Sequence, residues 1–403
     1  MKKITGLLLG IAFLFGMNTQ KSIEGTQTNE ISVQMEETAV CVSTENTGLT
    51  TQAKAAYLME YGTKTPIYAF KETERLPIAS MCKIMTLLLS FEAVEEGLVS
   101  MEEEICVSEN AASMGGSQVF LEANAKYPVR ELIKSIVVCS ANDSCVAMAE
   151  KIAGSESAFV DRMNEKAKEL GAENTLFANC TGLPKQPQYS CAKDVAVMLK
   201  SLLKYEEYHE FGKVWMDKFA HPKGRYTEIT NTNKLVRFYD GCDGGKTGFT
   251  NEAGFCLAAT AKRENMRIIS VVIGEETSAN RFEDVRFMFD YAFANYKVSS
   301  VAEENVNLTQ AASVKGGKVK SVCVYPKRTA YAFMKKGEKD PITTQVHVKA
   351  LKAPIQQGES VGELIVFKNG FEVDRVELLA ASSVRKANLF DYFKDVAENW
   401  NVR

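Results

Sequence analysis

The chain has 403 residues, of which 45% are hydrophobic and 25% are charged, and its formal net charge at pH 7 is -3. This length predicts two or three domains with a substantial core, and the slightly acidic balance excludes the basic surface that binds nucleic acid. The three histidines, His209, His221 and His347, are scattered along the chain. They form no ligand-spaced pair, so we expect no metal site and no cofactor.

The N-terminus has the pattern of an export signal. Met1-Lys2-Lys3 precedes an apolar run from Ile4 to Met17, which is followed by polar residues. A basic start and an apolar core of this length are typical of a secretory signal, and the core is shorter than a usual membrane span. We assign residues 1–22 to the signal and residues 23–40 to a polar linker. No clear cleavage site follows, which leaves an uncleaved anchor as the alternative; in both cases we expect export to the outer face of the cytoplasmic membrane.

Ten cysteines are dispersed along the chain. Exported proteins often form disulfides, but none of these cysteines forms a Cys-x-x-Cys pair and the domains are large enough to fold without bridges. We expect small core residues with free thiols, and the sequence leaves their pairing open.

Two strand-like runs, residues 55–60 and 67–70, are joined by a polar turn. They precede the apolar run from Pro77 to Leu89, which predicts a buried helix that ends at Gly97. Helical patterns then dominate the middle of the chain, at residues 129–138, 146–152, 159–170 and 194–203.

After Gly245 the pattern changes to strands, at residues 254–261 and 268–273, and a helix is predicted at residues 282–296. Strands, then helices, then strands and a closing helix predict an α+β fold, in which a helical cluster packs against an antiparallel sheet. We assign residues 41–297 to this domain.

Beyond residue 297 the pattern changes to short strand-like runs, and Asn369-Gly370 between two of them is a strong hairpin signal. We assign residues 298–384 to a small all-β domain. The last segment, residues 385–403, places apolar side chains that include Leu389, Phe390 and Trp400 on one helical face. We expect an amphipathic helix on the membrane surface, with packing against the β domain as the alternative.

One serine and one lysine interrupt the apolar run from Pro77 to Leu89. Ser80 and Lys83 are three residues apart and share a helix face, so a hydroxyl lies beside a candidate base. A serine becomes a nucleophile when a neighbour takes its proton, and a lysine does so when burial lowers its pKa. Ser-x-x-Lys occurs three more times in the chain, so the motif is informative only together with others.

Two later stretches supply further candidates. Ser140 and Asn142 follow an apolar run, where a turn would direct both side chains into one site. The stretch Asp-Gly-Gly-Lys-Thr-Gly-Phe-Thr, residues 243–250, occurs once and has glycines that let its backbone approach a ligand. A phosphate loop would need a glycine five residues before Gly245, and that position holds Asp240. The nucleotide-binding interpretation is therefore excluded.

Ser-x-x-Lys, Ser-x-Asn and Lys-Thr-Gly, in this order, form the motif set of penicillin-binding proteins and related β-lactamases. The chain resembles the low-molecular-mass serine D-alanyl-D-alanine carboxypeptidases over nearly its whole length. The resemblance implies that it removes the terminal D-alanine of peptidoglycan stem peptides through an acyl-serine intermediate. It also implies acylation by β-lactams and no cofactor.

The same resemblance implies roles for the candidate residues. Ser80 is the expected nucleophile and Lys83 its general base, while Ser140 and Asn142 complete the proton network and hold the substrate amide. The backbone N–H groups of Ser80 and Phe249 are the expected oxyanion hole. The expected substrate-binding residues are Lys246, Thr247, Gly248, Phe249 and Arg281. For Arg281, a plain surface arginine is the alternative, and some relatives carry histidine in place of Phe249.

Other functions remain to be weighed. A class A β-lactamase needs a deacylating glutamate, usually in Glu-x-x-x-Asn, and no such spacing occurs between Cys145 and Gly245. A transpeptidase shares the acylation residues and stays open. From a different class, a non-catalytic envelope-binding module or an antibiotic sensor would keep this fold; the intact motifs argue against the module, and the lack of multiple membrane spans argues against the sensor.

Overall fold

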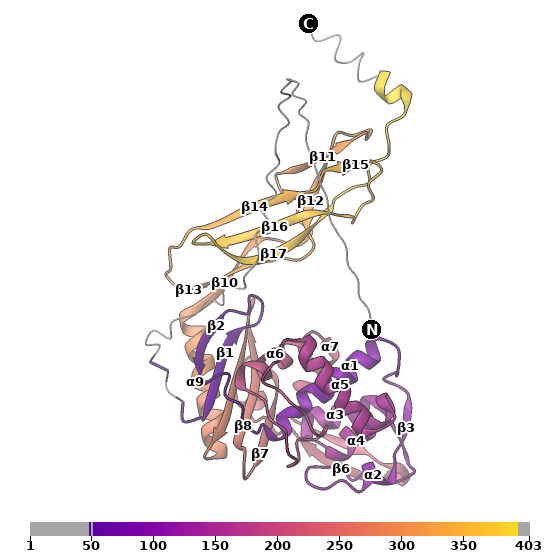
Figure 1. Ribbon diagram of the computed structural model, residues 1–403, viewed down its shortest axis with the longest axis vertical. Coiled ribbons are helices and arrows are strands. Elements are labelled where there is room, and N and C mark those ends of the chain that lie inside the picture. Colours follow the sequence, from indigo (N-terminus) through magenta and orange to yellow (C-terminus); the bar gives the residue numbers. More distant parts are fainter. Residues whose placement is uncertain (1–47, 50, 394–403) are drawn as a thin grey trace, which may run out of the picture. The chain divides into compact units, whose positions relative to one another are not determined.

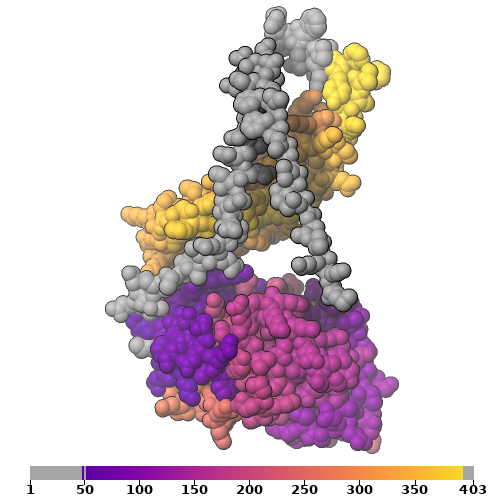
Figure 2. All heavy atoms as spheres, viewed as in Figure 1, coloured from indigo at the N-terminus to yellow at the C-terminus, as the bar shows by residue number. Residues whose placement is uncertain are grey.

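A computed structural model describes residues 48, 49 and 51–393, drawn as a ribbon in Figure 1 and with all heavy atoms in the same view in Figure 2. The expected signal, residues 1–22, and the expected linker, residues 23–40, lie outside the described residues. The same holds for the part of the expected C-terminal helix that begins at residue 394.

The first domain is built on a five-stranded sheet with the order β2-β1-β9-β8-β7, in which all neighbouring strands are antiparallel. Strand β1 is an inner strand, and its six residues are all buried. It pairs with β9, from the far end of the domain sequence. The strands are β1 (Ala55–Glu60), β2 (Pro66–Phe70), β7 (Cys242–Thr250), β8 (Gly254–Arg263) and β9 (Met266–Glu275).

Helices cover both faces of this sheet. Along β9, Ile269 and Val271 belong to one hydrophobic core, whereas Ile268 and Val272 belong to the other. Successive side chains of a strand point to opposite faces, so β9 is buried on both faces of the sheet. Figure 1 shows α9 (Ser278–Asn295) on one side of the sheet and the helical cluster on the other. The α+β prediction is confirmed.

The helical cluster lies mainly between β2 and β7 in the sequence. It begins with a 3-10 turn, η1 (Ala79–Cys82), which leads directly into α1. The helices are α1 (Lys83–Glu95), α2 (Glu109–Ala112), α3 (Val129–Cys139), α4 (Asn142–Ala153), α5 (Glu156–Glu169), α6 (Ala192–Leu202), α7 (Glu206–Gly212) and α8 (Leu235–Phe238).

Two short hairpins within the cluster were not predicted from the sequence. One pairs β3 (Glu104–Cys106) with β4 (Lys126–Pro128), and the other pairs β5 (Met216–Ala220) with β6 (Tyr226–Thr230). Their strands alternate buried and exposed residues over only three to five positions. Such a short period is too weak a signal to distinguish them from loops.

The second domain is all-β and has its own hydrophobic core. Its six-stranded sheet has the order β14-β16-β17-β12-β11-β15, and β10 pairs with β13 in a separate ribbon. The predicted Asn369-Gly370 turn joins β16 to β17, and both residues have positive φ, 53° and 82°. The strands are β10 (Tyr296–Ala302), β11 (Ala311–Lys315), β12 (Ser321–Pro326), β13 (Ala330–Lys335), β14 (Ile342–Val348), β15 (Leu351–Lys352), β16 (Ser360–Lys368) and β17 (Phe371–Ala380).

The expected C-terminal helix is described only in its first turn, residues 389–393. Leu389, Phe390 and Phe393 there are 73%, 85% and 68% exposed, so these apolar side chains are not packed into the β domain. Within the described ranges, no helix is long and apolar enough to cross a membrane.

Candidate active site

Ser80 lies on the 3-10 turn η1, one turn before α1 begins. The sequence predicted a single helix from Pro77, but Ala79 has a φ of 46° and starts the helical segment with a sharp turn. Two glycines allow other segments to reach this turn. A Cβ on Gly182 would lie 2.1 Å from the carbonyl oxygen of Ala79, and a Cβ on Gly248 would lie 2.7 Å from that of Ile78. The backbone of the Ser80 turn is therefore enclosed by two neighbouring segments, and a residue larger than glycine at position 182 or 248 would displace them.

Lys83 is fully buried and lies directly beside Ser80. Its Nζ atom donates a hydrogen bond to Ser80 Oγ at 3.1 Å and a second one to the carbonyl oxygen of Thr181. The i, i+3 spacing thus brings hydroxyl and amine together, as expected from the sequence. The contact has the geometry in which an amine can accept a serine proton.

Ser140 and Asn142 lie on the junction between α3 and α4. Ser140 ends α3 in the left-handed conformation, with φ 66°. Asn142 starts α4, and its Nδ2 atom donates to the Gly115 carbonyl oxygen at 2.7 Å. Ser140 Oγ and Asn142 Oδ1 are buried and have no hydrogen-bond partner among the described residues. Buried polar atoms without partners are rare in native proteins, and two of them on one junction are typical of a site that a ligand completes.

Lys246 is 1% exposed on β7, and its Nζ atom donates to the Thr247 carbonyl oxygen at 3.1 Å. Burial, together with the nearby charge of Lys83, lowers the pKa of Lys246 to about 7. Across the described chain, neither lysine forms an ion pair with a carboxylate. Two neighbouring buried amines without an anion make this site suited to a negatively charged ligand.

Arg281 is half-buried on α9 and contacts the end of β7. Its Nη1 atom donates to the Gly248 carbonyl oxygen at 3.1 Å, and its guanidinium lies 5.3 Å from the ring centre of Phe255. Burial lowers its pKa to about 10. Phe255 also stacks on Phe249, with the two ring centres 4.3 Å apart, and Phe249 is 50% exposed. Arg281 is therefore not a plain surface arginine.

Two functional candidates were missed by the sequence analysis. Asp143 is fully buried and accepts backbone hydrogen bonds from Val119 and Leu121, at 3.1 Å each, which holds that loop against the Ser140–Asn142 junction. Tyr208 is buried on α7 and contacts β7 directly before Lys246. The sequence shows an aspartate directly after Ser-x-Asn, which could have pointed to Asp143. No sequence pattern near Tyr208 indicates its contact with Gly245.

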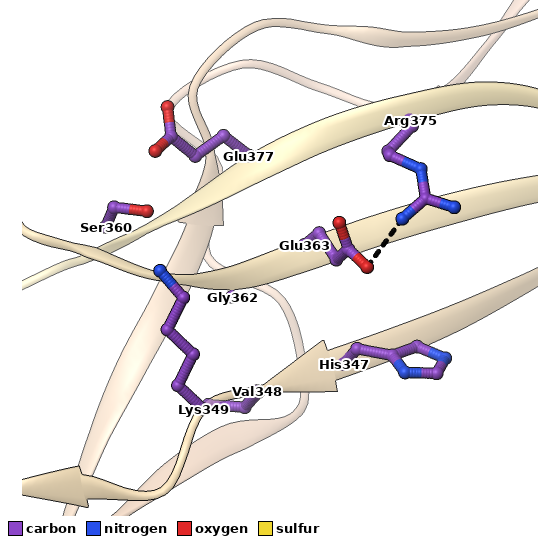
Figure 3. A pocket seen from close by; sticks show the side chains of 8 residues that line it. All are labelled: His347, Val348, Lys349, Ser360, Gly362, Glu363, Arg375 and Glu377. Atoms are coloured by element: carbon purple, nitrogen blue, oxygen red, sulfur yellow. Dashed lines mark hydrogen bonds and ion pairs between the residues drawn. The ribbon is translucent and has the colours of Figure 1, made fainter. Parts of the chain in front are cut away.

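A hollow of about 610 Å³ also lies on the β domain, against β14, β16 and β17 (Figure 3). Its two carboxylates are only partly buried, and each is paired with a cation: Glu363 accepts from Arg375 at 2.6 Å, and Glu377 accepts from Lys327, outside the hollow, at 2.8 Å. It has neither a buried nucleophile nor an unpartnered buried polar atom. The buried lysines and the unpartnered polar atoms that could support chemistry lie around Ser80 and not in this hollow.

Comparison with known proteins identifies the family. The model of the D-alanyl-D-alanine carboxypeptidase family, peptidase family S11, matches residues 40–277, and that of the penicillin-binding protein 5 C-terminal domain matches residues 296–386. The chain belongs to the D-alanyl-D-alanine carboxypeptidase family. The enzyme is accordingly a hydrolase of the penicillin-binding protein class, which confirms the resemblance seen in its motifs.

Individual relatives agree with this assignment. The D-alanyl-D-alanine carboxypeptidase DacF of Bacillus subtilis is 41% identical over 351 residues, which cover 87% of the enzyme and 90% of DacF. The solved structure of PBP3 from Streptococcus pneumoniae has a TM-score of 0.73 and 28% identity, covering 84% of the enzyme and 100% of that chain. Penicillin-binding protein 5 of Haemophilus influenzae has a TM-score of 0.69 and 27% identity, covering 84% and 98%.

Proposed function

We propose that the enzyme removes the terminal D-alanine of peptidoglycan stem peptides with Ser80 as its nucleophile, Lys83 as general base and Lys246 as the carboxylate-binding residue. The observation that carries this proposal is the 3.1 Å contact between Lys83 Nζ and Ser80 Oγ in a buried site that also holds Lys246. Nucleophile, base and anion-binding cation are the groups by which a serine-type carboxypeptidase can cleave a C-terminal peptide bond.

In the acylation step, Lys83 takes the Ser80 hydroxyl proton while Ser80 Oγ attacks the carbonyl carbon of the penultimate D-alanine. The backbone N–H groups of Ser80 and Phe249 stabilise the resulting oxyanion. The C–N bond then breaks, and the proton passes from Lys83 through the hydroxyl of Ser140 to the leaving nitrogen. D-alanine departs and an ester on Ser80 remains.

In the deacylation step, water adds to the ester carbonyl and the bond to Ser80 Oγ breaks, which restores the serine and releases the shortened peptide. Asn142 and Thr247 hold the substrate, Asn142 at the amide and Thr247 beside the carboxylate. The unpartnered Oδ1 atom of Asn142 supports this role, because a substrate N–H would supply the missing hydrogen bond. A β-lactam combines a strained amide with a carboxylate and enters the same pathway.

Gly248 and Arg281 shape the strand that binds the carboxylate. Gly248 allows β7 to approach the Ser80 turn, as its close contact with Ile78 indicates. Arg281 holds the Gly248 carbonyl and adds positive charge near the carboxylate position. We keep residues 41–297 and 298–384 as the proposed boundaries of the catalytic and β domains.

The decisive experiment is mass spectrometry of the intact protein after exposure to penicillin, together with an assay of D-alanine release from a peptide ending in D-Ala-D-Ala. We expect one covalent adduct on the wild-type enzyme and none on Ser80→Ala, which should also release no D-alanine. Full labelling of the Ser80→Ala variant would overturn the assignment of the nucleophile.

We also propose that residues 1–22 direct export and that the C-terminal helix binds the outer face of the cytoplasmic membrane. The basic-apolar-polar order of the first residues supports export. The exposed side chains of Leu389, Phe390 and Phe393 support membrane contact, because apolar groups of this size gain free energy at a lipid interface. Protease protection of the full chain in intact cells, lost on removal of the wall and outer barriers, would test export.

A further inference from the structure

The segment of β7 that leads into Lys246 has neighbours on both sides. A Cβ on Gly245, whose φ is 130°, would lie 2.3 Å from the Ala258 carbonyl oxygen on β8. A Cβ on Gly244 would lie 3.0 Å from the ring of Tyr208 on α7. Strand β7 is thus held between β8 and α7 at the two residues before Lys246, and small shifts there move the lysine.

Tyr208 makes the polar contact in this region. Its hydroxyl oxygen accepts a hydrogen bond from the backbone N–H of Gly245 at 2.9 Å, and its side chain is 1% exposed. Without this hydroxyl, the Gly245 N–H would be buried without a partner, which a folded chain avoids by moving its backbone. The peptide group that follows Gly245 is the one that carries Lys246.

The ring of Tyr208 also connects β7 to the helix of the nucleophile. It packs edge-on against Phe91 of α1, with ring centres 6.3 Å apart, and α1 begins at Lys83. Burial raises the pKa of the Tyr208 phenol, so the hydroxyl stays neutral in the working range of the enzyme. Tyr208 is therefore a fixed spacer between the Ser80–Lys83 helix and the Lys246 strand.

The start of β7 is anchored separately, so the contribution of Tyr208 is local. Asp243 receives two hydrogen bonds from Arg267 on β9, at 2.7 and 2.8 Å. Burial would raise the pKa of Asp243, but hydrogen bonds from His209 and Arg267 outweigh it and lower the pKa to about 2. This ion pair holds β7 in the sheet when Tyr208 is changed.

We propose that Tyr208 is a positioning residue for substrate carboxylate binding. By accepting the hydrogen bond of the Gly245 N–H, it fixes the position of the Gly245–Lys246 peptide group and therefore the position of the Lys246 ammonium group. The proposal rests on the proposed role of Lys246. Tyr208 does not touch the substrate; it acts through the backbone of Gly245.

The test compares Tyr208→Phe with the control Tyr205→Phe. Both tyrosines pack on Phe91, but the Tyr205 hydroxyl donates to Glu95 at the surface, at 3.2 Å, and has no contact with β7. Each substitution removes one oxygen and keeps the ring, so both variants should fold. Thermal unfolding of the full chain should show that both variants are folded, with the midpoint of Tyr208→Phe a few degrees lower because it loses a buried hydrogen bond.

The readout is the second-order rate of Ser80 acylation by benzylpenicillin and by its methyl ester, which lacks the carboxylate charge. The rate for the free acid divided by the rate for the ester measures carboxylate recognition. A general loss of structure would slow acylation by both compounds alike and leave this ratio unchanged. We expect Tyr208→Phe to lower this ratio on the order of tenfold, mostly through the free acid. Tyr205→Phe should keep the wild-type ratio, and Lys246→Gln should lower it more than Tyr208→Phe does.

The outcomes separate the inference from the proposed function. A lowered ratio in Lys246→Gln with an unchanged ratio in Tyr208→Phe would overturn the role of Tyr208 alone. An unchanged ratio in Lys246→Gln would overturn the carboxylate-binding role of Lys246, and this inference with it. Equal slowing of acid and ester in Tyr208→Phe would show a merely structural residue and would also overturn the inference.

Discussion

The Nζ atom of Lys83 lies 3.1 Å from Ser80 Oγ and also donates to the Thr181 carbonyl oxygen. The second bond fixes the direction of the amine, because Thr181 belongs to the segment that encloses the Ser80 turn through Gly182. The amine of Lys83 is thus oriented by a backbone group that cannot itself ionise.

Replacing Lys83 tests this arrangement most directly. We expect Lys83→Met, which keeps the length and removes the amine, to slow penicillin acylation by about 10²- to 10⁴-fold, the usual contribution of a general base. Stopped-flow measurement of acylation gives the rate, and competition with a labelled penicillin reports non-covalent binding. Acylation at the wild-type rate in this variant would contradict the role of Lys83.

The pKa of about 7 for Lys246 predicts a pH dependence in the free enzyme. The lowered pKa means that the charged form dominates below about pH 7 and is lost as the pH rises through this value. A carboxylate ligand favours the charged form, so binding above about pH 7 must take up a proton. We expect acylation by benzylpenicillin to decline above this pH, whereas its methyl ester shows no such decline. Parallel profiles for the two compounds would contradict the assignment.

Glu275 predicts a second pH effect, on stability. Burial, together with the contact with Asp284, raises its pKa to about 8, and both of its carboxylate oxygens lack a hydrogen-bond donor among the described residues. A raised acid pKa means that the folded state holds the proton more tightly than the unfolded state. The associated stability is present below about pH 4.5 and is lost as the pH rises through about 8.

Glu275→Gln should therefore unfold at a higher temperature than the wild type at alkaline pH, by about 2 to 4 °C. Near pH 4.5 the two should differ little. Glu276→Gln is the control, because Glu276 is the exposed neighbour. Its charge is the smallest of the causes that raise the pKa of Glu275, so its removal should shift the pH profile only slightly. If the unfolding temperatures of Glu275→Gln and the wild type differ by the same amount at every pH, the raised pKa of Glu275 is refuted.

Phe249 lies where its backbone N–H is the expected oxyanion donor. Replacing the side chain leaves that N–H in place, so we expect Phe249→His and Phe249→Ala to keep acyl-enzyme formation. The rate should change by no more than about tenfold, because the ring contributes only its stacking on Phe255. Steady-state D-alanine release measures this, and complete inactivity of Phe249→His would mean that the ring itself is required.

The membrane proposal is tested by deletion. Removing residues 388–403 from protein without residues 1–22 should move it from the membrane pellet to the soluble fraction, because the exposed Leu389, Phe390 and Phe393 are then lost. Penicillin acylation should stay intact, since Ser80 lies in a different domain. If both forms sediment alike, the segment has a structural role.

Local features of this enzyme were determined by the sequence alone. The Ser80–Lys83 contact joins residues three apart in one helical segment, and the Asn369-Gly370 turn joins adjacent residues; in both cases short-range geometry decides the outcome. The α+β fold class was also predictable from the sequence, because it depends on the order of the strands and helices and not on their exact bounds.

Tertiary structure decided how distant segments close around Ser80. The left-handed Ala79, the approach of Gly182 and Gly248 to the nucleophile turn, and the contact of Tyr208 with Gly245 join segments far apart in the chain. No local pattern encodes such contacts, because they depend on how helices and strands pack once the whole core has formed. The sequence could name Ser140 and Lys246 as candidates, but the burial that lowers the pKa of Lys246 and leaves Ser140 Oγ without a partner exists only in the folded chain.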